Sequence, residues 1–300
     1  MSVLVNVNGQ VTDGASATIS VFDHGFLYGE GVYETIRTYN GEPFLFDRHM
    51  QRLRASAAMI MLDVPLSDAE YLKRSVVTMA AANLGRRSDG TVAEAYIRIL
   101  HTRGVGDLSY DPAATPTPSV VVIIKPLPVP AEEQFRNGVK VCMVDIIRNH
   151  PRSVSPLIKS NNLLNNALCM QEALRKGGVE GVFRNYRGEL SECSQSNLFI
   201  VTGGVVRTPP LEAGLLAGIT RGFVFEVGAA LGIPVEETVL RDADLFNADE
   251  AFFTSTTKEL MPIVRVDDRA IGTGTPGGIT QRLLAEYRRR ANEMTTAVVR

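Results

Sequence analysis

The chain has 300 residues, of which 45% are hydrophobic, so it can bury one large core or two moderate ones. Its formal net charge is −2 with acids and bases interspersed, which argues against nucleic acid or a membrane surface as a partner. No apolar run is long enough to span a membrane, and three cysteines (Cys142, Cys169 and Cys193) fit no metal-binding spacing. We therefore expect a cytoplasmic protein with reduced thiols and no metal site.

The first 124 residues carry signals for hairpins and two helices. Alternating apolar residues around Asn8-Gly9 predict an N-terminal hairpin, which a glycine-rich loop follows at 20–31. Asp47 is expected to cap one helix, and Ser67 a second helix that runs to Gly85. Strands are expected over 32–39, 91–100 and 119–124.

Alternate prolines over 125–130 predict an extended interdomain linker. We therefore expect a small N-terminal α+β domain at 1–124 and a larger C-terminal α+β domain at 131–300. The larger domain is predicted to contain a strand over 139–147, a helix from 163 to the glycines at 177–178, hairpin turns at 187–188 and 203–204, a helix over 218–232, a strand over 251–254 and a last helix over 279–290. This mixture favours an α+β fold over a doubly wound sheet.

One lysine stands just before a predicted helix. Lys159 follows the apolar run 156–158. The helix beyond it has an apolar stripe that we expect to be buried, formed by Leu163, Ala167, Met170 and Leu174. A hydrated ammonium beside a buried face is costly unless it is paired, deprotonated or used covalently. A lysine that reaches solvent is the ordinary alternative.

Three polar features accompany this lysine in the second half. Glu192 is suited to hold a protonated ring nitrogen, with hydrogen bonds expected from Ser191, Ser194 and Asn197. The helix start at Gly218 offers N–H groups, and Thr220 a hydroxyl, to an anion. Residues 254–257 place four hydroxyls at an expected strand-to-helix turn, a second anion cradle. The alternatives are a solvent-exposed glutamate, a common helix cap and an ordinary turn.

Together, one amine, one carboxylate and two anion cradles match the needs of pyridoxal 5′-phosphate. Its aldehyde requires an amine, its pyridinium nitrogen an acid, and its phosphate N–H and O–H donors.

The order and wording of several segments resemble the fold-type IV pyridoxal-phosphate enzymes, which include branched-chain aminotransferases, D-amino-acid aminotransferases and aminodeoxychorismate lyases. The likeness covers almost the whole chain. The segments that carry it are Asp23-His-Gly-Phe-Leu-Tyr-Gly-Glu-Gly-Val-Tyr-Glu34, His49-Met-Gln-Arg-Leu53, Lys159-Ser-Asn-Asn-Leu-Leu164, Ser191-Glu192 with Ser196-Asn-Leu-Phe199, Gly218-Ile-Thr-Arg221 and Ser255-Thr-Thr257.

This resemblance implies the two-domain fold-type IV architecture of the D-amino-acid-aminotransferase kind, a homodimer, and a role for each matching residue. Lys159 is implied to be catalytic, through a ping-pong aldimine mechanism, and Glu192 to pair with the pyridine nitrogen. The phosphate is implied to be held by Arg52, Gly218, Ile219, Thr220, Ser255 and Thr256. The substrate is implied to contact Tyr28 of the partner subunit and Tyr33, Arg37, Tyr96, Arg98 and Thr257.

The resemblance favours a branched-chain aminotransferase that moves the amino group of L-amino acids to 2-oxoglutarate. The segments 95–98 and 102–108 resemble that type, and the Arg-x-His carboxylate trap of D-amino-acid aminotransferases is incomplete at Arg103-Gly-Val105. The segments 159–164 and 255–257 read closer to the D-type, and Lys258 stands where alanine is commoner. A D-amino-acid or (R)-amine transaminase, an aminodeoxychorismate lyase and a non-catalytic binding protein therefore remain as alternatives.

Overall fold

The computed structural model describes residues 3–87, 89–115 and 117–297. These residues form two compact units, the first from the described residues within 1–128, 158–162 and 291–300, and the second from 129–157 and 163–290. Three details differ from the expected boundaries, and one is that residues 291–297, expected in the C-terminal domain, are counted with the first unit. Lys125 and Pro126 end a strand, because they pair with Tyr96 and Ala95. Lys159 belongs to the first unit, because its backbone bonds to a strand there.

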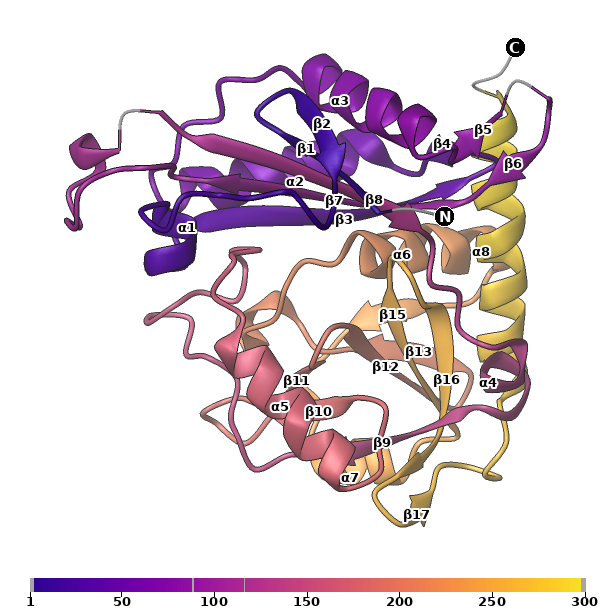
Figure 1. Ribbon diagram of the computed structural model, residues 1–300. Coiled ribbons are helices and arrows are strands. Elements are labelled where there is room, and N and C mark those ends of the chain that lie inside the picture. Colours follow the sequence, from indigo (N-terminus) through magenta and orange to yellow (C-terminus); the bar gives the residue numbers. More distant parts are fainter. Residues whose placement is uncertain (1–2, 88, 116, 298–300) are drawn as a thin grey trace. The chain divides into compact units, whose positions relative to one another are not determined.

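The first unit is built on a six-stranded antiparallel sheet with the strand order β2-β1-β8-β7-β3-β4 (Figure 1). Its elements are β1 (Leu4–Val7), β2 (Gln10–Asp13), α1 (His24–Leu27), β3 (Gly31–Tyr39), β4 (Glu42–Pro43), α2 (Phe46–Ala58), α3 (Asp68–Ala81), β5 (Gly85–Arg86), β6 (Val92–Ala93), β7 (Ala95–Thr102), η1 (Pro112–Ala114) and β8 (Ser119–Pro126).

Helices α2 and α3 cover one face of this sheet (Figure 1). Side chains alternate between the faces of a strand, and those at even positions of β3 and odd positions of β7 are buried against the helices. The core between them includes Ile36, Leu53, Tyr71, Ile97 and Ile124. The opposite face carries the remaining side chains of β3, β7 and β8, which are central to the candidate site.

The second unit is built on a nine-stranded mixed sheet. Its strands are β9 (Val139–Met143), β10 (Gly181–Arg184), β11 (Leu190–Cys193), β12 (Asn197–Thr202), β13 (Val205–Thr208), β14 (Val235–Glu237), β15 (Glu250–Ser255), β16 (Glu259–Val266) and β17 (Arg269–Ala270). Its helices are α4 (Glu132–Asn137), α5 (Leu164–Arg175), η2 (Leu211–Ala213), α6 (Ile219–Leu231), α7 (Asp242–Phe246) and α8 (Gly278–Ala297), the last seven residues of which are counted with the first unit.

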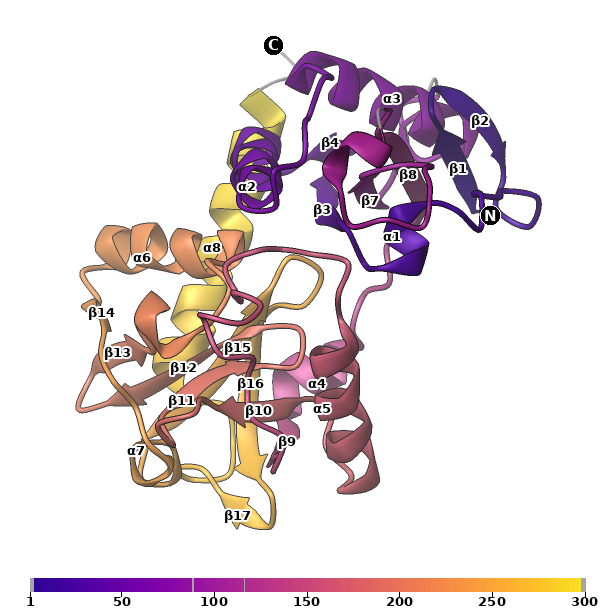
Figure 2. The same cartoon turned by 90° about the vertical axis from the view of Figure 1, so that its left-hand side faces the viewer.

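Two helices pack on different parts of this sheet. Helix α5 runs beside β9 and β10, and α6 runs beside β14 and β15 (Figure 2). The aromatic rings of Phe199 and Phe252 stack in the core with centroids 4.9 Å apart. Cys142, Cys169 and Cys193 are free and buried, and burial raises the pKa of the Cys169 thiol to about 12. The cysteines therefore act as small core residues.

Several local predictions are confirmed. The N-terminal hairpin forms, and the Ser67 hydroxyl accepts a hydrogen bond from the N–H of Glu70 at the start of α3. Helix α6 lies between Gly218 and the left-handed Gly232, as the two glycines predict. The expected hairpin turns at 187–188 and 203–204 also form.

Other local predictions are wrong. Asp47 lies inside the first turn of α2, whose N-cap is Leu45. Helix α3 ends at Ala81, four residues before Gly85. The stripe expected on α5 is not the buried one, because Ala167 and Leu174 are exposed while Cys169 and Ala173 are buried.

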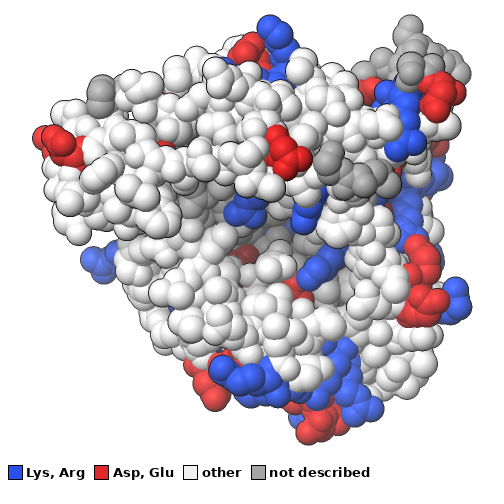
Figure 3. All heavy atoms as spheres, viewed as in Figure 1, with Lys and Arg blue, Asp and Glu red and all other residues white. Residues whose placement is uncertain are grey.

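One strand is shorter and one helix longer than expected from the sequence. The strand expected over 139–147 ends at Met143, and the last helix runs from Gly278 to Ala297. None of the described helices is both long enough and apolar enough to cross a membrane. Acidic and basic side chains are scattered together over the face in Figure 3, as expected from a net charge of −2.

Two glycines with positive φ provide a matched test of close backbone packing. Gly104 has φ +95°, and a Cβ there would lie 1.9 Å from the Thr117 carbonyl oxygen; Gly90 has φ +83° and open space around it. We expect Gly90→Ala to lower the free energy of unfolding by about 1–2 kcal/mol, the cost of a left-handed alanine. Gly104→Ala should cost about 1–3 kcal/mol more, because the backbone must move. Urea denaturation of both variants measures this, and equal losses would contradict it.

Candidate active site

Four of the expected substrate residues lie on one face of the six-stranded sheet. In the register of β3 and β7, Arg37 is directly opposite Tyr96, and Thr35 is opposite Arg98. Tyr33 lies two residues from Thr35, on the same face. This is the face that α2 and α3 do not cover, so the sheet brings two arginines and two tyrosines together.

The segment that contains Lys159 pairs with the start of β3. The N–H of Tyr33 donates to the carbonyl oxygen of Lys159 (2.9 Å), and the N–H of Asn161 donates to that of Gly31 (2.8 Å). The N–H of Lys159 donates to the Ser56 hydroxyl on α2 (3.1 Å). The backbone on both sides of Lys159 is therefore fixed to the first unit.

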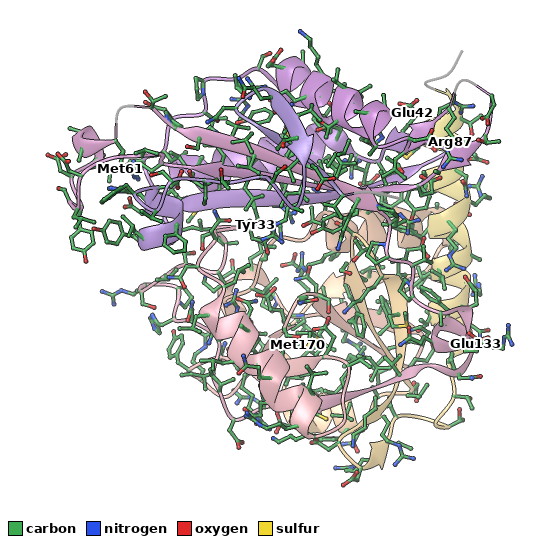
Figure 4. The ribbon with its side chains drawn as sticks, viewed as in Figure 1. Tyr33, Glu42, Met61, Arg87, Glu133 and Met170 are labelled. Carbon is green, nitrogen blue, oxygen red and sulfur yellow. The ribbon has the colours of Figure 1, made fainter. Side chains whose placement is uncertain are left out.

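The ring of Tyr33, which projects from β3 (Figure 4), collects two cations. The Lys159 Nζ atom lies 4.4 Å from its centroid, and the Arg98 Cζ atom lies 4.0 Å from it. Lys125, on β8, places its Nζ atom 4.8 Å from the ring centroid of Tyr96. All five side chains are half-buried. The face is therefore aromatic and positively charged, the chemistry that suits a carboxylate substrate.

Arg52 lies on α2 and bonds to a carboxylate on the helix-covered face of the sheet. Its Nε and Nη2 atoms donate to the two oxygens of Glu34 (2.7 and 2.8 Å), and the His49 Nδ1 atom lies 2.7 Å from Glu34 Oε2. Burial alone would raise the pKa of Glu34, but the charges of Arg52 and His49 outweigh it and lower the pKa to about 2. Burial lowers the pKa of His49.

Tyr28 and Arg103 contact other parts of the first unit. The Tyr28 ring packs against those of His24 and Tyr110, with centroids 4.9 and 5.0 Å away. The Arg103 guanidinium donates to the carboxylate of Glu30 and to the carbonyl oxygens of residues 60 and 61. Arg103 is therefore a structural residue that joins two loops.

In the second unit, Glu192 is buried and held by three donors. The Arg148 Nε atom donates to Oε1 (2.8 Å), while the Leu216 N–H (3.1 Å) and the Asn197 amide (3.4 Å) donate to Oε2. Of the three neighbours expected from the sequence, only Asn197 forms this bond. Ser191 donates to the Gly214 carbonyl oxygen, and Ser194 bonds to Glu180.

The expected anion-binding residues lie at a helix start and at a turn. Gly218 is the N-cap of α6, without a side-chain cap among the described residues, and Thr220 is buried in its first turn. A Cβ at Gly218 would lie 2.0 Å from Asn197 Oδ1, so this approach needs glycine. Residues 256–258 join β15 to β16, so the turn lies between two strands and not, as expected, before a helix.

An ion pair with a buried glutamate fixes this turn. The Lys258 Nζ atom donates to Glu180 Oε1 (2.7 Å), and the Glu180 side chain is fully buried. The Lys258 N–H donates to the Ser255 hydroxyl (3.2 Å). Lys258, which stands where alanine is commoner in the family that the sequence resembles, is therefore the charge partner of Glu180.

The sequence did not point to Arg148, to Glu180, or to the contacts of Glu34 with Arg52 and His49 (the Glu34 network). Arg148 carried one usable signal, because it directly follows the strand expected over 139–147, and site residues commonly lie on the loops after strands. Glu34 and Glu180 carried none, since their partners lie 14 or more positions away in the chain.

Comparison with known proteins gives a consistent result. Residues 31–266 match the family model for amino-transferase class IV. The chain is 36% identical over 284 residues to a Methanocaldococcus jannaschii protein named "Putative branched-chain-amino-acid aminotransferase", covering 95% of both. It is 34% identical over 276 residues to the D-alanine aminotransferase of Bacillus licheniformis, covering 92% of this chain and 93% of that one. A solved structure of a T.th. branched-chain amino acid aminotransferase with pyridoxamine 5′-phosphate has a TM-score of 0.90 at 27% identity, covering 98% of this chain and 95% of that one.

The Glu34 network predicts a pH-dependent stability. Glu34→Gln removes the buried carboxylate that Arg52 and His49 contact, so the free energy of unfolding should fall by about 3–5 kcal/mol at neutral pH. The lowered pKa of Glu34 stabilises the fold above its usual value of 4.5, and this contribution is lost as pH falls toward about 2. The difference between wild type and variant should therefore shrink over that window in urea denaturation.

Glu70→Gln is the matched control. Glu70 pairs with Arg74 on the surface of α3. Its loss should cost less than about 1 kcal/mol. If Glu34→Gln costs no more than this control, the network does not stabilise the first unit as described.

Proposed function

The chain belongs to the class IV aminotransferases, and on this premise we propose that it transfers the amino group of branched-chain L-amino acids to 2-oxoglutarate. Enzymes of this class use pyridoxal 5′-phosphate. When bound, this cofactor supplies an aldehyde that carries the amino group and a ring that withdraws electrons.

The donor set of the second unit fits this cofactor. A carboxylate offers about four lone-pair positions, and three donors reach Glu192, so one acceptor position is left for a ring N–H. Thr254 is opposite Asn197 in the sheet register, and its buried hydroxyl has no partner among the described residues. Both observations support a polar ligand beside Glu192.

We assign the remaining cofactor contacts as proposals. The N–H groups of Ile219 and Thr220 and the Thr220 hydroxyl would bind the phosphate at the start of α6, where the helix dipole favours an anion. Gly218, Ser255 and Thr256 would support them, and Thr257 would face the substrate carboxylate. Arg52 would contribute charge, although two of its nitrogens bond to Glu34.

Lys159 is proposed to move the proton at the substrate Cα atom. Support comes from its fixed backbone, its half-buried side chain and the aromatic ring that orients its Nζ atom. The same amine would hold the cofactor at its aldehyde carbon. Proton transfer requires a base within hydrogen-bond reach, and the three backbone bonds restrict where this amine can go.

The sheet face supports both proposed substrates. Aliphatic side chains of Leu100, Val121 and Ile123 share this face with Arg98, as the register of β7 and β8 requires. A branched side chain would pack on the aliphatic part, and the second carboxylate of 2-oxoglutarate would bind the arginine. This combination is the observation that carries the proposal. The bonds of Arg103 to Glu30 and to two carbonyl oxygens leave it unsuited to a D-type carboxylate trap.

A donor panel tests this function. With 2-oxoglutarate as acceptor, L-leucine should be turned over at least about tenfold faster than D-alanine, a difference of about 1.4 kcal/mol. Lys159→Ala should abolish both reactions, while Lys73→Ala, an exposed position on α3, should leave them unchanged. Faster turnover of D-alanine would favour the D-amino-acid transaminase, the function named for the Bacillus licheniformis relative. Pyruvate released without an acceptor would mark the lyase.

A homodimer is part of the proposal, and one apolar surface supports it. The segments 20–26 and 103–110 are joined by backbone bonds, including His24 N–H to the Gly104 carbonyl oxygen (2.9 Å). Their exposed side chains include Phe22 (51% exposed), Phe26 (66%), Leu108 (70%) and Tyr110 (81%). Exposed apolar surfaces of this kind mark interfaces, and Tyr28 beside this one would contact the substrate of a second copy. A cytoplasmic location also belongs to the proposal, because the three cysteines are free.

Phe26→Asp tests the dimer. We expect the variant to be a monomer by light scattering, because an aspartate at the interface would bury an unpaired charge. Val77→Asp is the control, since Val77 is similarly exposed (50%) on the outer side of α3. A dimeric Phe26→Asp variant would place the interface elsewhere.

A further inference from the structure

Lys125 lies on the substrate face of the six-stranded sheet, although its proline-rich surroundings predicted a linker. It is opposite Tyr96 in the register of β7 and β8, and Tyr96 is opposite Arg37 in the register of β3 and β7. Arg37, Tyr96 and Lys125 therefore form a row across three neighbouring strands. Arg98 is opposite Ile123, so it is the diagonal neighbour of Lys125.

Three cations on this face are in contact with rings and not with carboxylates. Among the described residues, no ion pair joins Arg98, Lys125 or Lys159 to an acidic side chain, and their ring contacts are those with Tyr33 and Tyr96. A cation–π contact at an exposed site stabilises by about 0.5–1 kcal/mol and leaves the positive charge in place. Three such charges on one sheet face favour an anionic ligand.

The acidic side chains near this face do not satisfy Lys125. Glu42 lies on β4, opposite Tyr39 of β3. Strand β4 is three strands from β8, so the backbones of the two strands are about 14 Å apart at the usual strand spacing. Glu94 bonds to the Thr38 hydroxyl, on the helix-covered face. No acidic side chain of the described residues pairs with Lys125, so its charge is available to an anionic ligand.

We propose that Lys125 acts with Arg98 to bind the distal carboxylate of a dicarboxylic substrate, and so determines the preference for dicarboxylic over monocarboxylic 2-oxo acids. Diagonal neighbours in a sheet are about 7–8 Å apart at their backbones, within reach of two long side chains that converge on one carboxylate. Arg98 offers a planar fork, and Lys125 a compact charge. A monocarboxylic acceptor such as pyruvate has no group to pair with Lys125. This inference rests on the proposed function.

The test compares two acceptors in Lys125→Met, which keeps a similar side-chain length over Tyr96 but removes the charge. With one amino donor, the ratio of kcat/KM for 2-oxoglutarate to kcat/KM for pyruvate should fall about tenfold, the effect of one charged hydrogen bond. Lys125→Arg should restore most of the ratio. Lys73→Met, on the exposed side of α3, should leave it unchanged.

A second measurement does not depend on turnover. Glutarate, a dicarboxylate without an oxo group, should raise the Tm of the wild-type protein, and Lys125→Met should lose most of this shift. If the variant keeps both the acceptor ratio and the glutarate shift, the proposal is wrong. If the wild type does not turn over 2-oxoglutarate, the proposed function fails. In that case, a rise in Tm with glutarate that is lost in Lys125→Met would still support the carboxylate site at Lys125. A rise in Tm that the variant keeps would overturn that site.

Discussion

The pairing of residues 159–161 with the start of β3 is the constraint on which the first unit's chemistry depends. Strand β4 pairs with the end of β3, and the Lys159 segment pairs with its beginning, so both occupy the same edge of the sheet. A segment distant in sequence thereby becomes part of the first unit. Main-chain bonds on both sides of Lys159 fix the backbone from which its side chain extends.

Charge is arranged differently on the two faces of that sheet. On the helix-covered face, Arg52 pairs with the buried carboxylate of Glu34, because a buried charge without a partner is costly. On the opposite face, Arg98 and Lys125 lie over aromatic rings, which leave their charge available. One sheet thus separates a structural ion pair from a surface suited to anionic substrates. In the second unit, Arg148 pairs with Glu192, and we propose that a ring nitrogen of the cofactor donates to the remaining acceptor position of that carboxylate.

Local features were the predictable part of this fold. Ser67 caps α3 and two glycines bound α6, because caps and left-handed glycines act within a few residues. The buried side of α5 was not predictable from its apolar spacing, since packing of Cys169 and Ala173 decided it. The sequence indicated Lys159, Glu192 and the α6 start as site residues through their resemblance to a family. The pairing of Arg148 with Glu192 and the place of Lys125 opposite Tyr96 needed the structure, because the two partners of each pair lie far apart in the chain.

The central claim, that Lys159 is the amine that holds the cofactor, has one direct test. Reduction of the purified holoenzyme with borohydride, followed by proteolysis and mass spectrometry, identifies the lysine that carries a phosphopyridoxyl group. The account predicts this mass on the peptide that contains Lys159. Label on Lys125, Lys258 or any other lysine, with Lys159 unmodified, would contradict it.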